Sequence, residues 1–291
     1  MNFARLILSA VALSLSVPLP AAEPNLIWEA TGFQSPESAI YDEVRDVIYV
    51  SNLATRGKEA IPGDGFISKL SPSGQIIDLK WVTGFDNPKG VTLANGRLYV
   101  GDDKDLVEID LNAGQIVARY EPADGPGNFN DVTADSAGNV YVCSGRLHTV
   151  FRLQDGRFEP WVKLDRDQTG GINGLRAEAD RLLLGGWTLK DANGEEQLGH
   201  LSTVDLATKS VGRIGHQPIS RIDGIEPDGQ GGYTVTDWVT GQVSTVTADG
   251  VPATLMTLGQ GTADHEYIIA QQMLIMPSML DGIVRAFRWA P

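Results

Sequence analysis

A short phrase recurs six times along the chain, and this repeat limits the folds that the sequence can adopt. Each copy has a polar residue, an apolar stretch, a turn and a second apolar stretch. The copies read PESAIYDEVRDVIYVSN, PKGVTLANGRLYVGD, FNDVTADSAGNVYVCS, INGLRAEADRLLLGGW, IDGIEPDGQGGYTVTD and ADHEYIIAQQMLIMPS. The polar residues, called the anchors below, are Glu37, Lys89, Asn130, Asn173, Asp223 and Asp264, spaced by 52, 41, 43, 50 and 41 residues. Because no linker interrupts the series, we predict one repeat array and not two domains.

Each unit carries the pattern of four β-strands. A third apolar stretch follows the second in every copy, as in GFISKLSPSG and DLVEIDLNAG, and a fourth usually comes next, as in QIIDLKWV. Turns rich in Gly and Asp separate these stretches, and helical periodicity is nowhere sustained. Four strands per repeat are typical of a propeller blade. We therefore predict an all-β chain that folds as a six-bladed β-propeller over residues 23–291.

The two ends of the array complement one another. The sixth unit stops at Trp289 after its third strand, whereas a lone apolar stretch, residues 26–30, precedes the first anchor. We predict that this N-terminal stretch is the fourth strand of the last blade. Such closure would remove an open sheet edge and join the two ends without a covalent bond.

Residues 1–22 have the pattern of a secretory signal. Arg5 is followed by an apolar run and then by two alanines at the expected cleavage point. The run is interrupted by prolines and is too short to span a bilayer. We expect a mature protein that is exported to the periplasm or secreted, with no membrane association after cleavage.

The net charge and the cysteine count limit the classes of binding partner and the covalent bonds that the chain can form. The formal net charge is −14 and becomes −15 once Arg5 is removed, which argues against nucleic acid or an anionic membrane surface as a partner. Cys143 is the single cysteine, so an internal disulfide is excluded, and its apolar neighbours predict a buried, inert thiol. A monomer that acts on a small molecule is expected.

The anchors are predicted to meet at the propeller axis, because the first strand of each blade lines the central channel. Carboxylate and carboxamide oxygens come from Glu37, Asn130, Asn173 and Asp223, in blades one, three, four and five. Hard divalent cations, above all calcium, prefer such oxygens. Zinc or copper would require several His or Cys ligands, and the four histidines show no metal-binding spacing. The ring therefore predicts a hard-cation site with room for substrate.

A second interpretation of the ring stays open. Polar residues at channel-facing strand starts can simply hydrate a water-filled tunnel or cap backbone groups. This explains the polarity of the ring, but not the occurrence of two carboxylates and two carboxamides in blades one, three, four and five. The tryptophans, among them Trp81, Trp161, Trp187 and Trp238, are scattered over strands and strand ends. Most are expected to pack between blades, although one or two near strand ends could line a substrate mouth.

Four of the copies resemble a known set of motifs. Glu37-Ser-Ala-Ile-Tyr-Asp42, Asn130-Asp131, Asn173-Gly174-Leu175 and Asp223-Gly224-Ile225 are similar to the E-G-P-x-W-D, N-D-G, N-G-L and D-G-M motifs of the senescence marker protein/gluconolactonase/luciferin-regenerating enzyme family. The motifs fall in the same blades and the same order, and the resemblance covers essentially the whole mature chain. It implies a six-bladed propeller that hydrolyses lactones or related esters with a divalent metal.

The resemblance also implies roles for particular residues. Glu37, Asn173 and Asp223 match the family's metal ligands, and Asn130 matches a residue that contacts substrate. Asn128 stands where members acting on sugar lactones place an arginine. Because that arginine would bind polar substrate oxygens, its absence argues against a gluconolactone-like substrate.

Two assignments remain open at the sequence level. Lys89 could bind an anionic substrate or could pair with Glu37 or Asp223. Asp223 is the first candidate for the base that activates water, although a metal-bound carboxylate is a weak base; Asp131 and His265 are the alternatives.

The leading functional prediction is a calcium-dependent hydrolase of a lactone or small ester, acting at the axis. The alternative is a noncatalytic exported propeller that binds a small molecule or a protein, with a structural ion.

Overall fold

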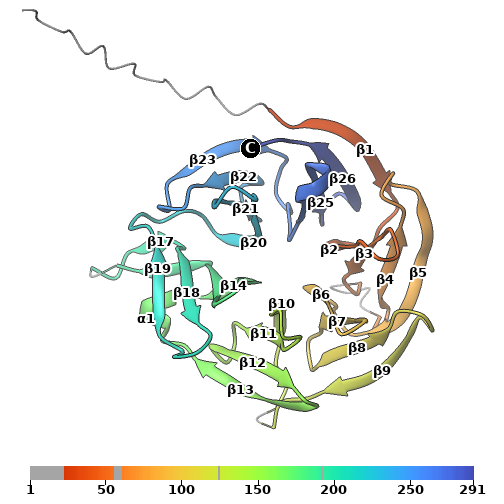
Figure 1. Cartoon of the computed structure of the whole chain (residues 1–291), viewed down its shortest axis with the longest axis horizontal. Coiled ribbons are helices and arrows are strands. Elements are labelled where there is room, and N and C mark those ends of the chain that lie inside the picture. The colour runs from red at the N-terminus through yellow and green to blue at the C-terminus, as the bar shows by residue number, and fades with distance from the viewer. Residues whose placement is uncertain (1–22, 56–60, 124, 192) are drawn as a thin grey trace, which may run out of the picture.

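The fold is a ring of six four-stranded antiparallel sheets around a central axis, in a computed structural model that describes residues 23–55, 61–123, 125–191 and 193–291 (Figure 1). This confirms the predicted six-bladed β-propeller. The predicted signal, residues 1–22, lies outside the described residues. Among the described residues, helices are short, and none has the length and apolar character needed to cross a bilayer.

Each blade runs outward from the axis in the order of the chain. Blade one consists of β2 (Pro36–Asp42), β3 (Val47–Asn52), β4 (Gly65–Leu70) and β5 (Ile76–Phe85). Blade two consists of β6 (Val91–Ala94), β7 (Arg97–Gly101), β8 (Leu106–Asp110) and β9 (Gln115–Tyr120). Blade three consists of β10 (Phe129–Ala134), β11 (Val140–Ser144), β12 (Thr149–Gln154) and β13 (Arg157–Lys163). Blades four and five consist of β14 (Ile172–Ala177), β15 (Arg181–Gly186), β18 (Leu201–Asp205) and β19 (Val211–Ile214), and β20 (Ile222–Pro227), β21 (Tyr233–Asp237), β22 (Gln242–Val246) and β23 (Pro252–Thr257).

The sixth blade is closed by the N-terminal strand, as predicted. Its strand order from the axis is β24 (Glu266–Ile268), β25 (Met273–Ser278), β26 (Ile283–Arg288) and β1 (Asn25–Thr31). Ala30 is paired with Val284 and both side chains are buried, while the Arg285 Nε donates to the Glu29 carboxylate at 2.8 Å. Closure therefore combines a strand ladder, apolar packing and an ion pair.

Burial follows from the position of each strand in the blade. All six residues of β3 are buried because the second strand has sheet neighbours on both sides and blades on both faces. The outer strand β9 instead alternates exposed and half-buried residues, which is the period-two pattern of a strand with one wet face. Apolar side chains of adjacent blades fill the space between them, as where Tyr49 packs near Trp81 and Val91. Cys143 is fully buried in such a layer, and burial raises the pKa of its thiol.

Blade four departs from the regular pattern. A hairpin of β16 (Thr188–Lys190) and β17 (Glu196–Leu198) is inserted between its second and third strands. The short helix α1 (Arg166–Thr169), which begins at the N-cap Asp165, precedes the blade and contacts β16. A single 3-10 turn, η2 (Ile269–Gln271), joins β24 to β25. The insertion and α1 build up one side of the ring at the anchor end of the axis.

Candidate functional site

A backbone irregularity turns four of the anchors toward the axis. In blades one, three, four and five the pairing of the first two strands shifts register across the anchor, for example between Ile172 and Leu175 around Asn173, and between Ile222 and Ile225 around Asp223. A β-bulge of this kind redirects a side chain away from the regular alternation of the strand. The repeated bulge explains why these polar residues face the channel although the strands they begin are apolar.

Glycines after the anchors let the inner strands approach one another. A Cβ on Gly174 would lie 2.4 Å from the Asp223 carbonyl oxygen, and one on Gly90 would lie 2.6 Å from the Asp131 Cα. Both distances are far below a van der Waals contact, so a larger residue at either position would push two blades apart. The glycine therefore keeps the anchors of neighbouring blades close together.

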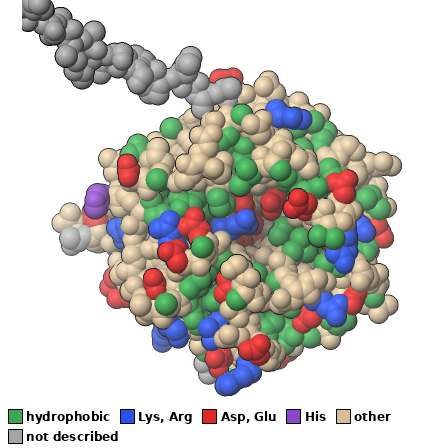
Figure 2. Space-filling view, in the orientation of Figure 1, with side chains coloured by type: hydrophobic (Ala, Val, Ile, Leu, Met, Phe, Trp, Pro, Cys, Tyr) green, Lys and Arg blue, Asp and Glu red, His purple; other side chains and the backbone are tan. Residues whose placement is uncertain are grey.

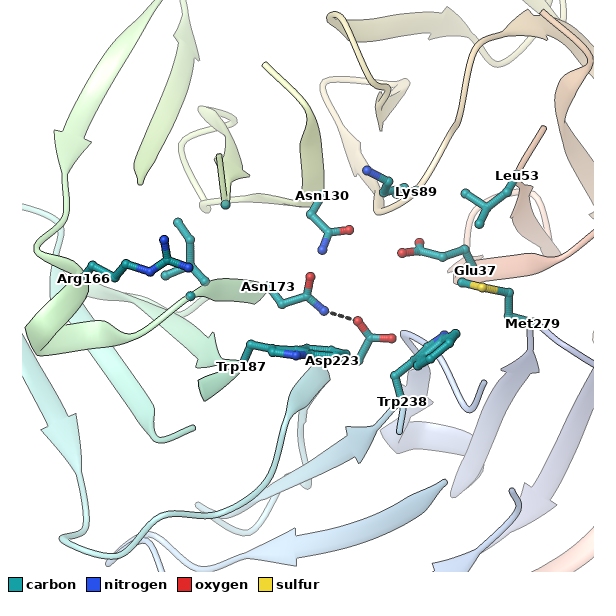
Figure 3. A pocket seen from close by; sticks show the side chains of 13 residues that line it. Glu37, Leu53, Lys89, Asn130, Arg166, Asn173, Trp187, Asp223, Trp238 and Met279 are labelled. Carbon is teal, nitrogen blue, oxygen red and sulfur yellow. Dashed lines mark hydrogen bonds between the residues drawn. The ribbon is translucent and has the colours of Figure 1, made fainter. Parts of the chain in front are cut away.

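Five predicted site residues share one cavity of about 420 Å³ at this end of the axis (Figure 3). This volume suits a small molecule. The cavity is lined by Glu37, Leu53, Lys89, Asn130, Gly145, Arg166, Gly171, Ile172, Asn173, Trp187, Asp223, Trp238 and Met279. The blades follow one another in opposite rotational order in Figures 1 and 3, so the two figures view the ring from opposite ends.

Asp223 and Asn173 form the centre of the cavity. The Asn173 Nδ2 donates to the Asp223 Oδ1, while the Asp223 Oδ2 is buried without a hydrogen-bond partner among the described residues (Figure 3). Burial, followed by the nearby Asp264 carboxylate, raises the pKa of Asp223 to about 8. A buried carboxylate with an unsatisfied oxygen is a group that a bound cation would stabilise.

The oxygen donors of the cavity fit a hard cation. The side chains of Glu37, Asn130, Asn173 and Asp223 point from four blades toward the same space in Figure 3. Within the described residues, no three His, Cys, Asp or Glu side chains are grouped so that they could hold a metal ion by themselves. The set here mixes two carboxylates with two carboxamides, and such a set suits calcium better than zinc or copper.

Lys89 is held at the edge of the cavity by blades two and three. Its Nζ donates to the Phe129 carbonyl oxygen at 3.0 Å and lies 3.4 Å from both the Asp103 carboxylate and the Asn128 Oδ1. The ion pair found for Lys89 is with Asp103, a carboxylate that the sequence did not single out. Asn128 is exposed and has a left-handed backbone (φ 46°); it does not line the cavity but contacts it through Lys89.

Asp131 and His265 lie outside this cavity. The Asp131 Oδ2 accepts a 2.8 Å hydrogen bond from the Leu175 backbone N–H, and burial together with Asp264 and Glu37 raises the pKa of Asp131 well above its usual range. The His265 Nε2 is 2.7 Å from the Thr234 hydroxyl, and burial lowers the pKa of the ring to about 3. Neither side chain lines the space that the anchors surround.

Apart from the two tryptophans, six lining residues were not predicted from the sequence with a role in the site: Leu53, Gly145, Arg166, Gly171, Ile172 and Met279. Arg166 comes from α1, and its guanidinium makes no ion pair among those found in the described part of the chain. Leu53 and Met279, like Trp187 and Trp238, immediately follow the second strand of a blade. The sequence could have indicated these residues, because each stands at the same point of its repeat, directly after the second apolar stretch.

Known structures share this architecture. A gluconolactonase from Xanthomonas campestris matches with a TM-score of 0.68 and 16% identity over 94% of this chain and 97% of that chain. A protein named as a candidate gluconolactonase matches at 0.64 and 16% over 94% and 93%. An auxiliary nutrient binding protein from Bacteroides thetaiotaomicron matches at 0.65 and 9% over 89% and 70%. The chain shares the fold of these gluconolactonase-like propellers.

Comparisons of sequence add no closer relative. No protein-family model matches the chain, and no curated protein matches it. A structural likeness at identities of 9 to 16% shows the fold alone, and the activity has to be argued from the site.

Proposed function

We propose that this protein is a calcium-dependent hydrolase of a lactone or another small ester, with its active site in the axial cavity. The observation that carries the proposal is the convergence of Glu37, Asn130, Asn173 and Asp223 in one cavity of substrate size. The motif resemblance to the gluconolactonase family and the fold shared with a gluconolactonase support it. Export and the removal of residues 1–22 belong to the same proposal.

The proposed ligands of the ion are Glu37, Asn173 and Asp223. When bound, the ion would polarise the substrate carbonyl and stabilise negative charge that develops on its oxygen. The Asn130 carboxamide lies beside these groups and would orient the substrate by hydrogen bonding. Lys89, fixed through its contacts with Phe129 and Asp103, would add a positive charge on the same side of the cavity.

A general base must take the proton from the attacking water. Asp223 is the proposed group, since its Oδ2 has no hydrogen-bond partner in the part of the chain that the structure describes and its carboxylate lines the cavity. Asp131 and His265 are the other candidates, but they would require a movement of the inner strands because both are hydrogen-bonded away from the cavity. We therefore assign them the supporting role of keeping the inner strands in place.

The test is metal analysis and turnover of Asp223→Ala beside the wild type. We expect the variant to lose at least about 100-fold in calcium affinity and to lose turnover of lactones and esters, because a ligand with an unsatisfied buried oxygen is removed. Asp249→Ala is the matched control, as Asp249 is an exposed turn residue. A wild-type protein that binds no calcium, or an Asp223→Ala variant with unchanged turnover, would contradict the proposal.

A second candidate is a noncatalytic propeller that binds a small molecule or an exported protein. Two observations favour it: the alternative bases Asp131 and His265 do not line the cavity, and an auxiliary nutrient binding protein shares the fold. Bound calcium without turnover across a broad panel of lactones and esters would select this candidate.

A further inference from the structure

Besides the anchors, each blade has a second equivalent position near the mouth of the cavity, and these six positions form a second ring. Its members immediately follow the second strands β3, β7, β11, β15, β21 and β25. They are Leu53, Asp102, Gly145, Trp187, Trp238 and Met279. Five of the six line the cavity, so the propeller repeat presents one equivalent position per blade to a bound molecule.

Apolar members of this ring are contiguous. Trp187, Trp238, Met279 and Leu53 belong to blades four, five, six and one, which are neighbours around the ring. We call these four residues the apolar arc. In Figure 3, Trp187 and Trp238 lie across the cavity from Lys89 and Asn130, and the arc continues through Met279 to Leu53, which lies next to Lys89.

The remaining two positions leave a gap in the ring. The Asp102 carboxylate is turned away to accept hydrogen bonds from the backbone N–H groups of Asp86 and Asn87, and Gly145 has no side chain. The anchors below this gap are Lys89 and Asn130, of blades two and three. The second ring is therefore apolar over blades four, five, six and one and open over Lys89 and Asn130, while the anchors Glu37, Asn173 and Asp223 lie in the same blades as three members of the arc.

The backbone of the apolar arc is fixed before any ligand binds. Trp187 donates its backbone N–H to the Gly171 carbonyl at 2.6 Å, and Gly171 in turn donates to the Thr188 carbonyl at 3.1 Å. The Trp238 carbonyl accepts from the Gly261 N–H at 2.8 Å. Both indoles remain half-buried and face the cavity, so they offer rigid apolar surface at a small entropic cost.

This surface discriminates between classes of substrate. A hydroxylated ring placed against indole, thioether and leucine groups would lose water from most of its hydroxyls, and only the two indole N–H groups could donate hydrogen bonds in return. An alkyl or aryl group placed there would instead remove apolar surface from water on both partners. Building on the proposed function, we infer that the substrate is a lactone or ester with an apolar body, which packs on the apolar arc while its carbonyl faces Lys89 and Asn130.

The test compares two lactones with the same six-membered ring, δ-decalactone and glucono-δ-lactone, on the calcium-loaded protein. We expect kcat/KM to be at least about tenfold higher for the alkyl lactone. Binding is measured in parallel by calorimetry with the corresponding lactams, which resist hydrolysis, and the alkyl lactam is expected to bind at least about tenfold more tightly. Equal values, or a preference for the hydroxylated ring in both assays, would overturn the inference.

Variants connect the preference to the apolar arc. Trp187→Ala and Trp238→Ala are each expected to lose about tenfold in affinity for the alkyl lactam and little for the hydroxylated one, whereas Trp187→Phe and Trp238→Phe should retain most of it. The Phe variants keep the test valid if an Ala variant does not fold. Trp81→Phe, in the layer between blades one and two, is the matched control. A preference that survives both Ala substitutions would also overturn the inference.

Failure of the inference can be told from failure of the proposed function. Turnover of glucono-δ-lactone in preference to δ-decalactone would leave the hydrolase standing and reject the apolar substrate. Selective, tryptophan-dependent binding of the alkyl lactam with no turnover of either lactone would reject the hydrolase and retain an apolar ligand. An absence of binding by both lactams would overturn the inference.

Discussion

Asn130 and Asn173 occupy equivalent positions in blades three and four, yet their neighbours differ. The Asn173 carboxamide is hydrogen-bonded to Asp223, whereas Asn130 lies next to the blade that carries Lys89. The proposed ion would bind the oxygen of Asn173, and this needs only a rotation of its amide plane to exchange oxygen and nitrogen. The two asparagines therefore have different proposed roles although their side chains are the same, because different residues lie beside them around the ring.

The two asparagines can be separated by paired substitutions. We expect Asn173→Ala to lower calcium affinity by more than about tenfold, because a ligand is removed from the ion. Asn130→Ala should change that affinity less than about threefold and mainly lower kcat/KM. Calorimetry with calcium and steady-state kinetics on the same preparations measure both effects. Equal losses of calcium affinity in the two variants would show that the ligand assignment is wrong.

The sequence predicted the anchors better than it predicted their neighbours. The anchors recur at one point of each copy, so the propeller brings them together whatever their separation along the chain. Asp131 and His265 each follow an anchor directly, and neighbouring residues of an extended chain point to different sides. Their side chains therefore reach Leu175 and Thr234 of adjoining strands and not the cavity. Arg166 lies in a connection outside the repeat, where no periodicity could indicate its direction.

At the scale of strands, β1 is the element on which the ring depends. It completes blade six by pairing with β26 along its length, and Trp28 reaches blade one, where its Nε1 donates to the Pro72 carbonyl at 2.9 Å. A Cβ on Gly74 would lie 2.5 Å from that indole, so the turn before β5 needs glycine to accept it. β1 thus contacts both blades that meet at the closure.

Removal of residues 25–32 is expected to abolish soluble expression. The deletion exposes the full edge of β26 and the apolar side chains that Ala30 covers, and such an edge favours aggregation. Leu26→Asp is the matched control, since Leu26 is 56% exposed in the same strand and its substitution should change the free energy of unfolding by less than about 1 kcal/mol. Soluble yield and thermal melting measure both. A soluble deletion variant with an unchanged melting temperature would contradict this account of closure.

At the scale of the whole molecule, the axis concentrates negative charge. Below the cavity lie Asp131, Asp264, Glu226 and Glu266, with Arg176 bound to Glu226 at 2.8 Å. Arg176 and Glu266 line a separate hollow of about 350 Å³ that also includes Tyr41, at the opposite end of β2 from Glu37. Figure 2 shows charged side chains of both signs around the centre of that face. The propeller therefore encloses more carboxylates than cations along its channel.

This excess should make stability depend on pH. Burial raises the pKa of Glu266 to about 7 and that of Asp264 to about 6, so the folded chain holds protons that the unfolded chain releases. A buried carboxyl group whose pKa is raised in the folded state favours the fold while it is protonated, at low pH. This contribution is lost as the pH rises through the pKa of the group in the folded state. We expect the melting temperature in a chelator to fall between about pH 5 and about pH 8.

Substitutions identify the groups that cause the melting temperature to fall as the pH rises. Glu266→Gln removes one raised carboxyl, so the fall in melting temperature between the two pH values should become smaller, whereas Glu195→Gln, on the exposed insertion of blade four, should leave it unchanged. Calcium should raise the melting temperature more at the higher pH, where the carboxylates at the axis are ionised and their repulsion is greatest. Two results would show that the buried carboxylates at the axis do not cause this pH dependence. One is a melting temperature that rises with pH in the chelator, and the other is a fall in melting temperature for Glu266→Gln equal to that of the wild type.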